Sequence, residues 1–373
     1  SIDNPPVNPL SSGVRQGLFD GVTSALADDA IEAIVLTGLH RAFIAGADIS
    51  EFGAAATEGV GLGEALDKME GSTKPIIAAI NGTAFGGGLE VALCCDYRIA
   101  AATAPVGLPE VKLGLLPGAG GTQRLPRLVG AAAAVQAIVS GNPIMAPDAL
   151  AMGIVDRVAI GDIVDDAIAY AKEIVDAGAA TRKIRDLEDK ISADRGDTAL
   201  FEKFAANLDK THRGQFAPAQ ILQCVEAAVN AKSFDEGMAV ERARFAECMS
   251  DPQREALIHI FFAERAANKI PGLPKDVPLL DINKGSVIGA GTMGGGIAMC
   301  FANAGIPVRV HDNEPENLAR GIKVIEANYA RTVSKGRLTQ EEMDKRMSLI
   351  IPTENFEDLG DGDIVVEAVY ENL

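Results

Sequence analysis

The feature that most constrains the fold is a glycine pattern late in the chain, at residues 285–298 (GSVIGAGTMGGGIA). A short β-like run precedes Gly289, Gly291 and Gly294, and a helix rich in small residues is expected to follow, to about Ala304. Glycines at these three positions permit a tight turn, the close approach of a pyrophosphate, and close packing of the helix on the strand. The pattern therefore predicts a strand–turn–helix unit that binds a dinucleotide, in preference to a glycine-rich turn without a ligand.

The residues that follow extend this unit to a second strand. Gly305 is expected to end the helix, and Ile306–His311 is a predicted strand that runs into Asp312, 18 residues after Gly294. An acid at this place accepts hydrogen bonds from ribose hydroxyls and repels the 2′-phosphate of NADP, so the predicted cofactor is NAD. Glu367, near a fourth expected strand, is a further candidate for the cofactor site, and a surface acid at the end of the strand is the alternative.

A second glycine-rich segment lies at residues 81–95 (NGTAFGGGLEVALCC). A strand is expected to end at Asn81, and three glycines then lead into an apolar helical run with Glu90 on its first turn. Backbone N–H groups at the start of a helix are free to donate to an oxygen that gains negative charge, and glycines allow a ligand to come close. A carboxylate is also favoured near a helix N-terminus.

Two further segments supply matching chemistry. The small residues in 43–49 (FIAGADI) can expose another backbone donor, and residues 106–111 (VGLPEV) place Glu110 in a loop after an expected strand at Tyr97–Ala101. Glu110 follows Glu90 by 20 positions, enough for a helix, a strand and a return, so both carboxylates can face one cavity. Two carboxyl groups that flank one water can deprotonate it and supply a second proton, as hydration of an α,β-unsaturated thioester requires.

Each of these pieces has a simpler explanation when it is taken alone. The glycines can form only a tight turn, Glu90 can only complement the helix dipole, and Glu110 can be an exposed loop residue. Their order along the chain, followed by residues 115–125 (LLPGAGGTQRL), favours a site.

In combination these motifs resemble the crotonase (enoyl-CoA hydratase/isomerase) family over residues 5 to 185. The resemblance implies a spiral of ββα units and an oxyanion hole made by the N–H groups of Ala47 and Gly87. It implies that Glu110 delivers a proton to Cα while Glu90 helps to activate water. Arg41 corresponds to a position near the CoA phosphates, with a solvated arginine as the alternative. The motifs that carry the resemblance are residues 45–48 (AGAD), 81–82 (NG), 86–90 (GGGLE), 109–110 (PE) and 116–123 (LPGAGGTQ).

The presence of both glutamates favours a 2-enoyl-CoA hydratase that acts without a cofactor. Two alternatives stay open. One is a Δ3,Δ2-enoyl-CoA isomerase that works through Glu110 alone, and the other is a non-catalytic module that binds acyl-CoA.

Residues 289–294, 308–312 (VRVHD) and 363–369 (DIVVEAV) resemble the N-terminal part of L-3-hydroxyacyl-CoA dehydrogenases. The whole arrangement resembles multifunctional β-oxidation enzymes, in which one chain hydrates an enoyl-CoA and then oxidises the product with NAD. The expected fold class is α/β. A crotonase-like domain is expected at 1–185, a helical linker that packs on it at 186–283, and a partial Rossmann-type NAD-binding domain at 284–373. Linker helices are expected at 198–208, 219–231 and 251–268.

Two parts of the family pattern have no counterpart in this chain. The strand pair that precedes residues 4–8 in the family is absent, and so is the catalytic His–Glu pair of the dehydrogenase. His311 cannot take that role because it ends the second expected strand. The chain is therefore expected to be a fragment of a longer bifunctional enzyme, able to bind NAD but not to complete hydride transfer.

Local signals complete the expected secondary structure of the first domain. Ile31–Gly38 and Pro75–Asn81 are predicted strands, and Asp148 is predicted to cap a helix that ends near Gly153.

Composition narrows the classes of function and partner. Lys and Arg number 34 against 52 Asp and Glu, a net charge of −18, and there is no Trp, so nonspecific binding to nucleic acid or to anionic membranes is disfavoured. No apolar run is long enough to span a bilayer. The four His show no ligand spacing, so no metal site is expected.

The five cysteines form no CxxC pair and are expected to pack as small hydrophobes in a reducing compartment. The bacterial cytoplasm is the expected location, with the peroxisome as the alternative. Acyl-CoA is the expected small-molecule partner, and a thiolase or another β-oxidation enzyme is a candidate protein partner. The oligomeric state is left open.

Overall fold

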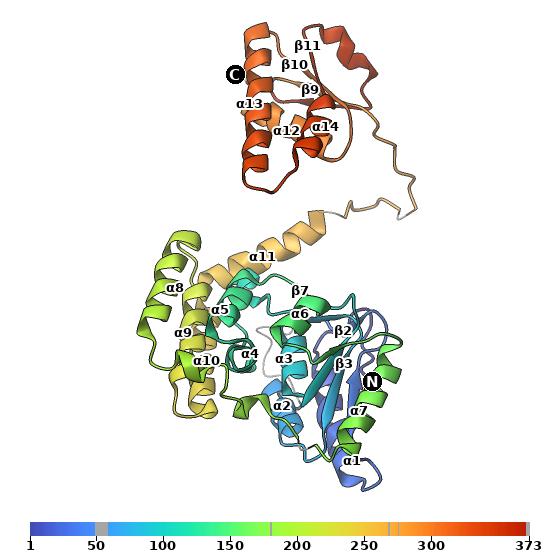
Figure 1. Cartoon of the computed structure of the whole chain (residues 1–373). Helices are drawn as coiled ribbons and strands as arrows, with labels where there is room; N and C mark the ends of the chain where they lie inside the picture. Colours follow the sequence, from blue (N-terminus) through green and yellow to red (C-terminus); the bar gives the residue numbers. More distant parts are fainter. Residues whose placement is uncertain (49–58, 180, 268, 275, 371–373) are drawn as a thin grey trace. The chain divides into compact units, whose positions relative to one another are not determined.

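The computed structural model describes residues 1–48, 59–179, 181–267, 269–274 and 276–370. It divides the chain into two compact units, Ser1–Lys269 and Ile270–Leu373, which Figure 1 shows. Among the described residues, no helix has the length and apolar character needed to cross a bilayer. Within the same ranges, no three His, Cys, Asp or Glu side chains are grouped to hold a metal ion.

Unit 1 contains two four-stranded sheets, and strands β1 to β6 alternate between them along the chain. One has the order β1-β3-β5-β8 and is parallel throughout, and the other has the order β2-β4-β6-β7, with only β7 antiparallel. Each pair of consecutive strands, β1–β2 and β3–β4, contributes one strand to each sheet and is followed by a helix. This is the expected spiral of ββα units. The strands are β1 (Ile34–Thr37), β2 (Ala42–Ile44), β3 (Ile76–Ile80), β4 (Thr83–Phe85), β5 (Tyr97–Ala100), β6 (Pro105–Gly107), β7 (Ile144–Met145) and β8 (Arg157–Val158).

The central strand β3 is apolar at every position because both of its faces are buried. Ile76, Ala78 and Ile80 belong to the main core, whereas Ile77 and Ala79 belong to a second core beneath helix α7 (Ile163–Asp176). Successive side chains of a strand point to opposite faces, so a strand covered on both faces must be apolar at every position. All five residues are fully buried, and the predicted strand is confirmed with its two ends trimmed.

Helices surround the sheets and then extend the unit beyond the last strand. The expected linker helices are confirmed as α8, α9 and α11, although Asn268, the last residue expected in α11, lies outside the described residues. A fourth helix, α10, was not predicted. Helix α9 packs against α4, α5 and α10, so this segment is part of unit 1 (Figure 1). The helices are α1 (Ser12–Ala27), α2 (Leu62–Glu70), α3 (Gly87–Cys94), α4 (Gly121–Val129), α5 (Ala131–Ser140), α6 (Ala146–Met152), α7, α8 (Thr198–Thr211), α9 (Ala217–Asn230), α10 (Phe234–Ser250) and α11 (Pro252–Ala267).

Two local predictions need correction. Helix α6 begins at Ala146 with Met145 as its N-cap, so Asp148 lies within the first turn and is not the cap. A proline favours the first turn of a helix because its φ is already fixed at a helical value. Helix α6 therefore begins before Asp148. Gly153 does end the helix, with φ 84°. Four of the cysteines are buried as expected, but Cys300 is exposed.

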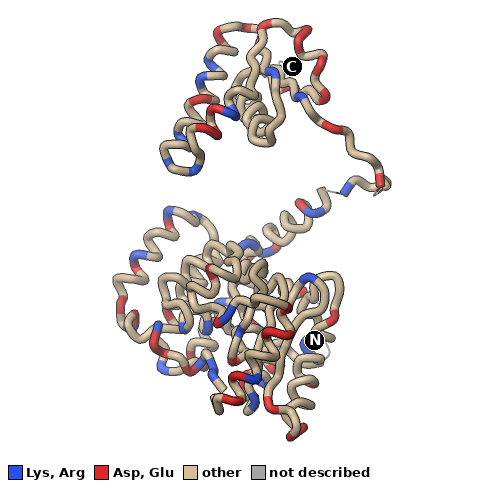
Figure 2. Tube along the Cα trace, turned by 45° about the vertical axis from the view of Figure 1, so that its right-hand side comes forward, with Lys and Arg blue, Asp and Glu red and all other residues tan. Residues whose placement is uncertain are grey.

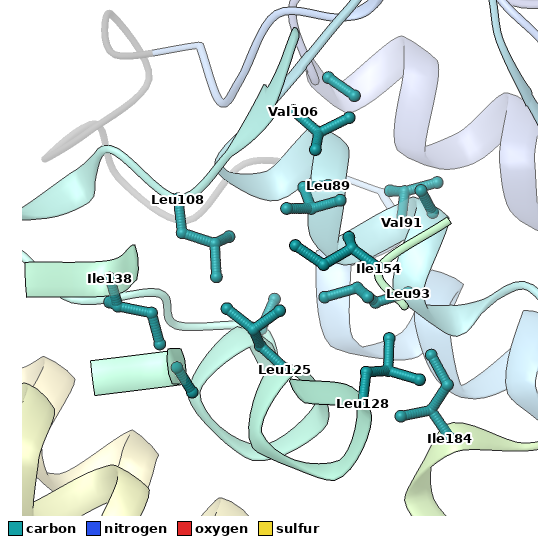
Figure 3. Close-up of a cluster of buried hydrophobic side chains, with 14 of the residues drawn as sticks. Leu89, Val91, Leu93, Val106, Leu108, Leu125, Leu128, Ile138, Ile154 and Ile184 are labelled. Carbon is teal, nitrogen blue, oxygen red and sulfur yellow. The ribbon is translucent and has the colours of Figure 1, made fainter. Parts of the chain in front are cut away.

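One apolar core fixes the elements that carry the candidate site. Figure 3 shows buried side chains of α3, α4 and α5 in a single cluster, with Leu89, Leu125 and Ile138 among the labelled ones. Each of these three is almost completely inaccessible to solvent. Burial of a leucine-sized side chain contributes roughly 1.5–3 kcal/mol. The positions of α3 and α4 relative to each other are therefore strongly determined.

Unit 2 has one parallel sheet of order β11-β10-β9-β12, the order of the first half of a doubly wound dinucleotide-binding fold. Its core contains Val287, Val308 and Val310 of the central strands. This agrees with the expected partial Rossmann-type fold. The elements are β9 (Gly285–Ile288), α12 (Thr292–Asn303), β10 (Val308–His311), α13 (Pro315–Ser334), α14 (Gln340–Ser348), β11 (Ile350–Thr353), η5 (Phe356–Asp361) and β12 (Ile364–Glu367).

Candidate active site

The carboxyl ends of three adjacent strands bring the predicted residues of unit 1 to one edge of a sheet. Strands β2, β4 and β6 are neighbours and parallel. Ala47 follows β2, Gly87 and Glu90 follow β4, and Glu110 follows β6. Ligands of α/β folds bind outside the carboxyl ends of parallel strands. The expectation that Glu110 lies in a loop is wrong, because it begins the 3-10 helix η2 (Glu110–Leu113).

The two predicted donor residues share a neighbour, Leu10. The N–H of Leu10 donates to the carbonyl of Gly46 at 2.8 Å, and Leu10 forms an isolated parallel bridge with Ala47. A Cβ placed on Gly87 would lie 3.0 Å from Cδ2 of Leu10. Gly87 is the first residue of α3, so its N–H has no acceptor within that helix. Ile49, at the end of the segment predicted to supply the other donor, lies outside the described residues.

At two positions of the glycine run, the backbone conformation or the packing requires a glycine. Gly86 has φ 55°, a left-handed conformation that favours glycine, and a Cβ there would lie 3.0 Å from Oε1 of Glu110. A Cβ on Gly88 would overlap the carbonyl oxygen of Ile44 in β2. The tight turn is therefore part of the candidate site, because it brings Glu110 against the start of α3.

Glu90 is buried and is held by two backbone donors. Its Oε1 accepts hydrogen bonds from the N–H of Ala119 at 2.7 Å and from that of Gly121 at 2.8 Å. Burial raises the pKa of Glu90, and the two N–H groups oppose that shift. The segment 116–123 singled out in the sequence carries these donors; it forms the turn that leads into α4 and the first residues of that helix.

Glu110 has the opposite surroundings. Its Oε2 is buried and has no hydrogen-bond partner among the described residues. Burial raises the pKa of Glu110 well above its ordinary value, and the negative charge of Glu90 raises it further. A raised pKa favours the protonated form of a carboxyl group, which is suited to donate a proton. An unpartnered buried oxygen is uncommon and is expected where a ligand binds.

Sequence reasoning missed a further carboxylate beside this turn, the buried Glu241 of α10. Its Oε1 accepts from the N–H of Gly120 at 2.7 Å, and its Oε2 accepts from the N–H of Thr122 at 3.1 Å and from the Thr122 hydroxyl. Burial and then the charge of Glu90 raise the pKa of Glu241 to about 8, while the Thr122 hydroxyl, the N–H of Gly120 and the charge of Arg124 oppose that shift. The segment around it is dense in charge, so no local signal distinguishes this glutamate from its neighbours.

Charged residues are spread along both units (Figure 2). A few charged side chains of unit 1 are buried, and their partners show what holds the candidate site in place. Arg124 of α4 forms a two-armed ion pair with Glu70, with Nε–Oε1 at 2.9 Å and Nη2–Oε2 at 3.0 Å. The same guanidinium donates to the carbonyl of Ala119 at 2.9 Å. Planar two-armed pairs fix geometry as well as charge, so Arg124 anchors the turn that holds Glu90.

Two features of unit 1 lie apart from this cluster. Arg41 is exposed, and its role near CoA phosphates stays a prediction. A cavity of about 600 Å³ lies between the N-terminal segment, α1 and β1, and none of its lining residues belongs to the carboxylate cluster.

In unit 2 the three fingerprint glycines differ in what requires them. Gly289 has φ 100°, and a Cβ on Gly294 would overlap the carbonyl oxygen of Gly289, so both are needed by the turn and its packing. Gly291 has an ordinary φ of −70°, and a Cβ there would meet nothing within 4 Å. The open space beside Gly291 fits the approach of a pyrophosphate to the start of α12.

The predicted acids of unit 2 lie at the carboxyl ends of strands. Asp312 follows β10, and its Oδ2 accepts from the N–H of Ala290 at 2.9 Å. Burial opposes the ionisation of Asp312, but the N–H groups of Ala290 and Glu314 lower its pKa overall. Glu367 is the last residue of β12 and is exposed. His311 is buried, with Nδ1 3.1 Å from the carbonyl oxygen of Thr353.

Comparison with protein families identifies both units. A family model described as enoyl-CoA hydratase/isomerase matches residues 1–227, and one described as the NAD binding domain of 3-hydroxyacyl-CoA dehydrogenase matches residues 284–373. The chain belongs to the enoyl-CoA hydratase/isomerase family. Its second unit is an NAD-binding domain of the dehydrogenase type.

Curated relatives show the same pairing of domains. A peroxisomal bifunctional enzyme of Cavia porcellus is 39% identical over 380 residues, which cover 100% of this chain and 52% of that protein. The Homo sapiens protein of the same name is 39% identical over 376 residues, covering 100% and 51%. A fatty acid oxidation complex subunit alpha of Psychrobacter cryohalolentis is 33% identical over 391 residues, covering 100% and 53%. The predicted resemblance to multifunctional β-oxidation enzymes is confirmed, and the chain spans about half the length of these relatives.

A solved structure supports the fold assignment of unit 1. An enoyl-CoA hydratase/isomerase from Pseudoalteromonas atlantica has a TM-score of 0.50 and 24% identity, over 69% of this chain and 88% of that one. At this identity the likeness concerns the fold alone.

Proposed function

We propose that unit 1 hydrates 2-trans-enoyl-CoA to L-3-hydroxyacyl-CoA, as the first half of a bifunctional β-oxidation enzyme. One observation carries the proposal. Two glutamates lie at one sheet edge in opposite surroundings. Glu90 is buried with two N–H donors on one oxygen, whereas Glu110 is half-buried and its buried Oε2 has no hydrogen-bond partner among the described residues. Carboxyl groups whose surroundings differ in this way can divide the roles of base and acid.

The proposed reaction uses the chain's own groups and water. The N–H groups of Ala47 and Gly87 donate to the thioester oxygen as it gains charge. Glu90 takes a proton from water, the hydroxide oxygen bonds to Cβ, and Glu110 gives its proton to Cα. A proton then passes from Glu90 to Glu110 and restores the starting state. The proposed hydration uses no cofactor.

Isomerisation is the second candidate, and it is favoured by Oε2 of Glu110, which has no hydrogen-bond partner in the part of the chain that the structure describes. A single carboxyl group can remove a proton from one carbon of a 3-enoyl-CoA and return it to another through the same enolate. A purely binding module has no need for either glutamate, so this alternative is the least supported.

The NAD-binding unit is proposed to serve the second, oxidative step in a longer protein. Gly289, Gly291 and Gly294 would hold the pyrophosphate, and Asp312 would hold the ribose hydroxyls, with Glu367 near the cofactor. NAD supplies the hydride acceptor when it is bound. A thiolase is the proposed protein partner, since the product of the oxidation is its substrate class. The bacterial cytoplasm is the proposed compartment, although several relatives carry peroxisomal names.

The direct test follows the absorbance of the conjugated thioester when the full chain is mixed with a 2-enoyl-CoA. The wild-type chain is expected to remove it. Glu90→Gln and Glu110→Gln are each expected to lower kcat by about 10²–10⁴-fold, the usual contribution of general acid–base catalysis. Glu32→Gln, which replaces an exposed glutamate outside the cluster, is the matched control, and its kcat should equal that of the wild type.

Two results would overturn parts of this proposal. A folded wild-type chain that leaves the absorbance intact excludes hydration. Full activity in Glu110→Gln contradicts its role as proton donor. If Glu90→Gln still converts a 3-enoyl-CoA to the conjugated isomer, isomerisation through Glu110 is a second activity.

A further inference from the structure

The turn that leads into α4, residues 119–122, presents four consecutive N–H groups to two carboxylates in alternation. The N–H groups of Ala119 and Gly121 donate to Glu90, whereas those of Gly120 and Thr122 donate to Glu241. Glu90 and Glu241 therefore both bind one short segment. A rotation of the turn that releases one carboxylate also moves the donors of the other.

The orientation of this network is fixed by a glutamine. Nε2 of Gln123 donates to the hydroxyl oxygen of Thr122 at 2.9 Å and to the carbonyl of Cys224 in α9 at 2.9 Å. Because the Thr122 oxygen accepts this bond, its hydrogen is free to point to Glu241. Gly237, one turn before Glu241 on α10, makes room for Gln123, since a Cβ there would overlap Oε1 of the glutamine.

We propose that Glu241 is a positioning residue for hydration, which holds the turn so that Ala119 and Gly121 fix the carboxylate of Glu90. Glu241 lies beyond residue 227, where the match to the hydratase family ends. The helix that supplies it thereby becomes part of the hydratase site. The inference rests on the proposed function and adds a residue to it.

The ionised form of Glu241, which predominates above its pKa of about 8, satisfies all three partners because each of them is a donor. Two N–H groups and one hydroxyl converge on Glu241, which is fully buried. A glutamine has the same size, but it offers one acceptor oxygen and turns an NH2 group toward a donor. Glu241→Gln therefore leaves at least one buried donor unpaired and is expected to shift the turn. A misplacement of about 1 Å can lower a rate about 10²-fold.

The test compares Glu241→Gln with Glu247→Gln in the full chain. Glu247 lies on the same helix, is exposed and is paired with Arg244. Glu241→Gln is expected to lower kcat about 10²-fold with KM unchanged, and Glu247→Gln is expected to change neither. Circular dichroism and thermal unfolding, run alongside, establish that each variant is folded and give its folded fraction.

A double-mutant cycle separates positioning from general loss of structure. If Glu241 acts through Glu90, its replacement in a Glu90→Gln background should lower the residual rate by less than about 2-fold. An equal loss in both backgrounds contradicts the proposal, as does a folded Glu241→Gln with wild-type kcat. Absence of hydration in the wild-type chain contradicts the proposed function instead, and this inference falls with it.

Discussion

At the scale of single residues, the site depends on how differently its glutamates are surrounded. Glu90 and Glu110 could be predicted because each lies in a short motif with glycine or proline beside it. Glu241 could not, because it lies 121 residues from Gly120, its hydrogen-bond partner, in a helix with many other charges. Only the packing of α10 on α4 brings these residues together.

The raised pKa values predict a bell-shaped dependence of kcat/KM on pH, because kcat/KM reports the ionisation of the ligand-free enzyme. Glu90 must be ionised to accept a proton, so kcat/KM should fall as pH drops through its raised pKa. Glu110 must be protonated to donate, so kcat/KM should also fall as pH rises through its own, higher pKa. The acidic limb should lie above the ordinary glutamate pKa of 4.5. Hydration rates at substrate concentrations well below KM, from pH 5 to 10, test this, and a flat profile contradicts it.

At the scale of elements, long and strongly patterned segments were predictable and short ones were not. β3 and the helices α8, α9 and α11 follow from apolar runs or from helical spacing. β4 and β6 have three residues each, and β6 reads Pro-Val-Gly, which gives no periodic signal. These two strands are nevertheless what places Gly87 and Glu110 at one sheet edge, so the site geometry could not be derived from pattern alone.

Contact between α3 and β2 gives a prediction at this scale. Gly88→Ala adds a methyl group that overlaps the carbonyl oxygen of Ile44, so either α3 or β2 must move. We expect the free energy of unfolding to fall by about 1–3 kcal/mol, as for other overpacked cores, with a loss of hydration. Gly63→Ala in α2 is the control, because its added methyl meets nothing within 4 Å. Denaturant unfolding that finds Gly88→Ala as stable as the wild type contradicts this packing argument.

At the scale of the whole molecule, the sequence predicted the order of the parts better than their contacts. The glycine fingerprint and strand spacing identified unit 2, because a βαβ unit is local in sequence. The inclusion of α8–α11 in the compact unit Ser1–Lys269 was expected only from resemblance, and the contribution of α10 to the candidate site was not expected.

NAD binding by unit 2 can be tested with a substitution that is expected to leave the fold of unit 2 intact. Gly291→Ala adds a methyl group into open space, so unit 2 should stay folded while the pyrophosphate is kept away. We expect NADH affinity to fall at least about tenfold, measured by NADH fluorescence with the full chain. Gly296→Ala, within the helix α12 that Gly291 precedes and also unhindered, should bind NADH as the wild type does. Equal affinity in Gly291→Ala would place the cofactor elsewhere.

The central claim is that Glu90 and Glu110 act together on one water and one thioester. The most direct measurement is the rate at which the full chain removes the conjugated-thioester absorbance of a 2-enoyl-CoA, compared with Glu110→Gln at the same pH. The account predicts rapid loss with the wild type and a decrease of about 10²-fold or more in the variant. No loss with the folded wild type, or equal rates in the two chains, would contradict it.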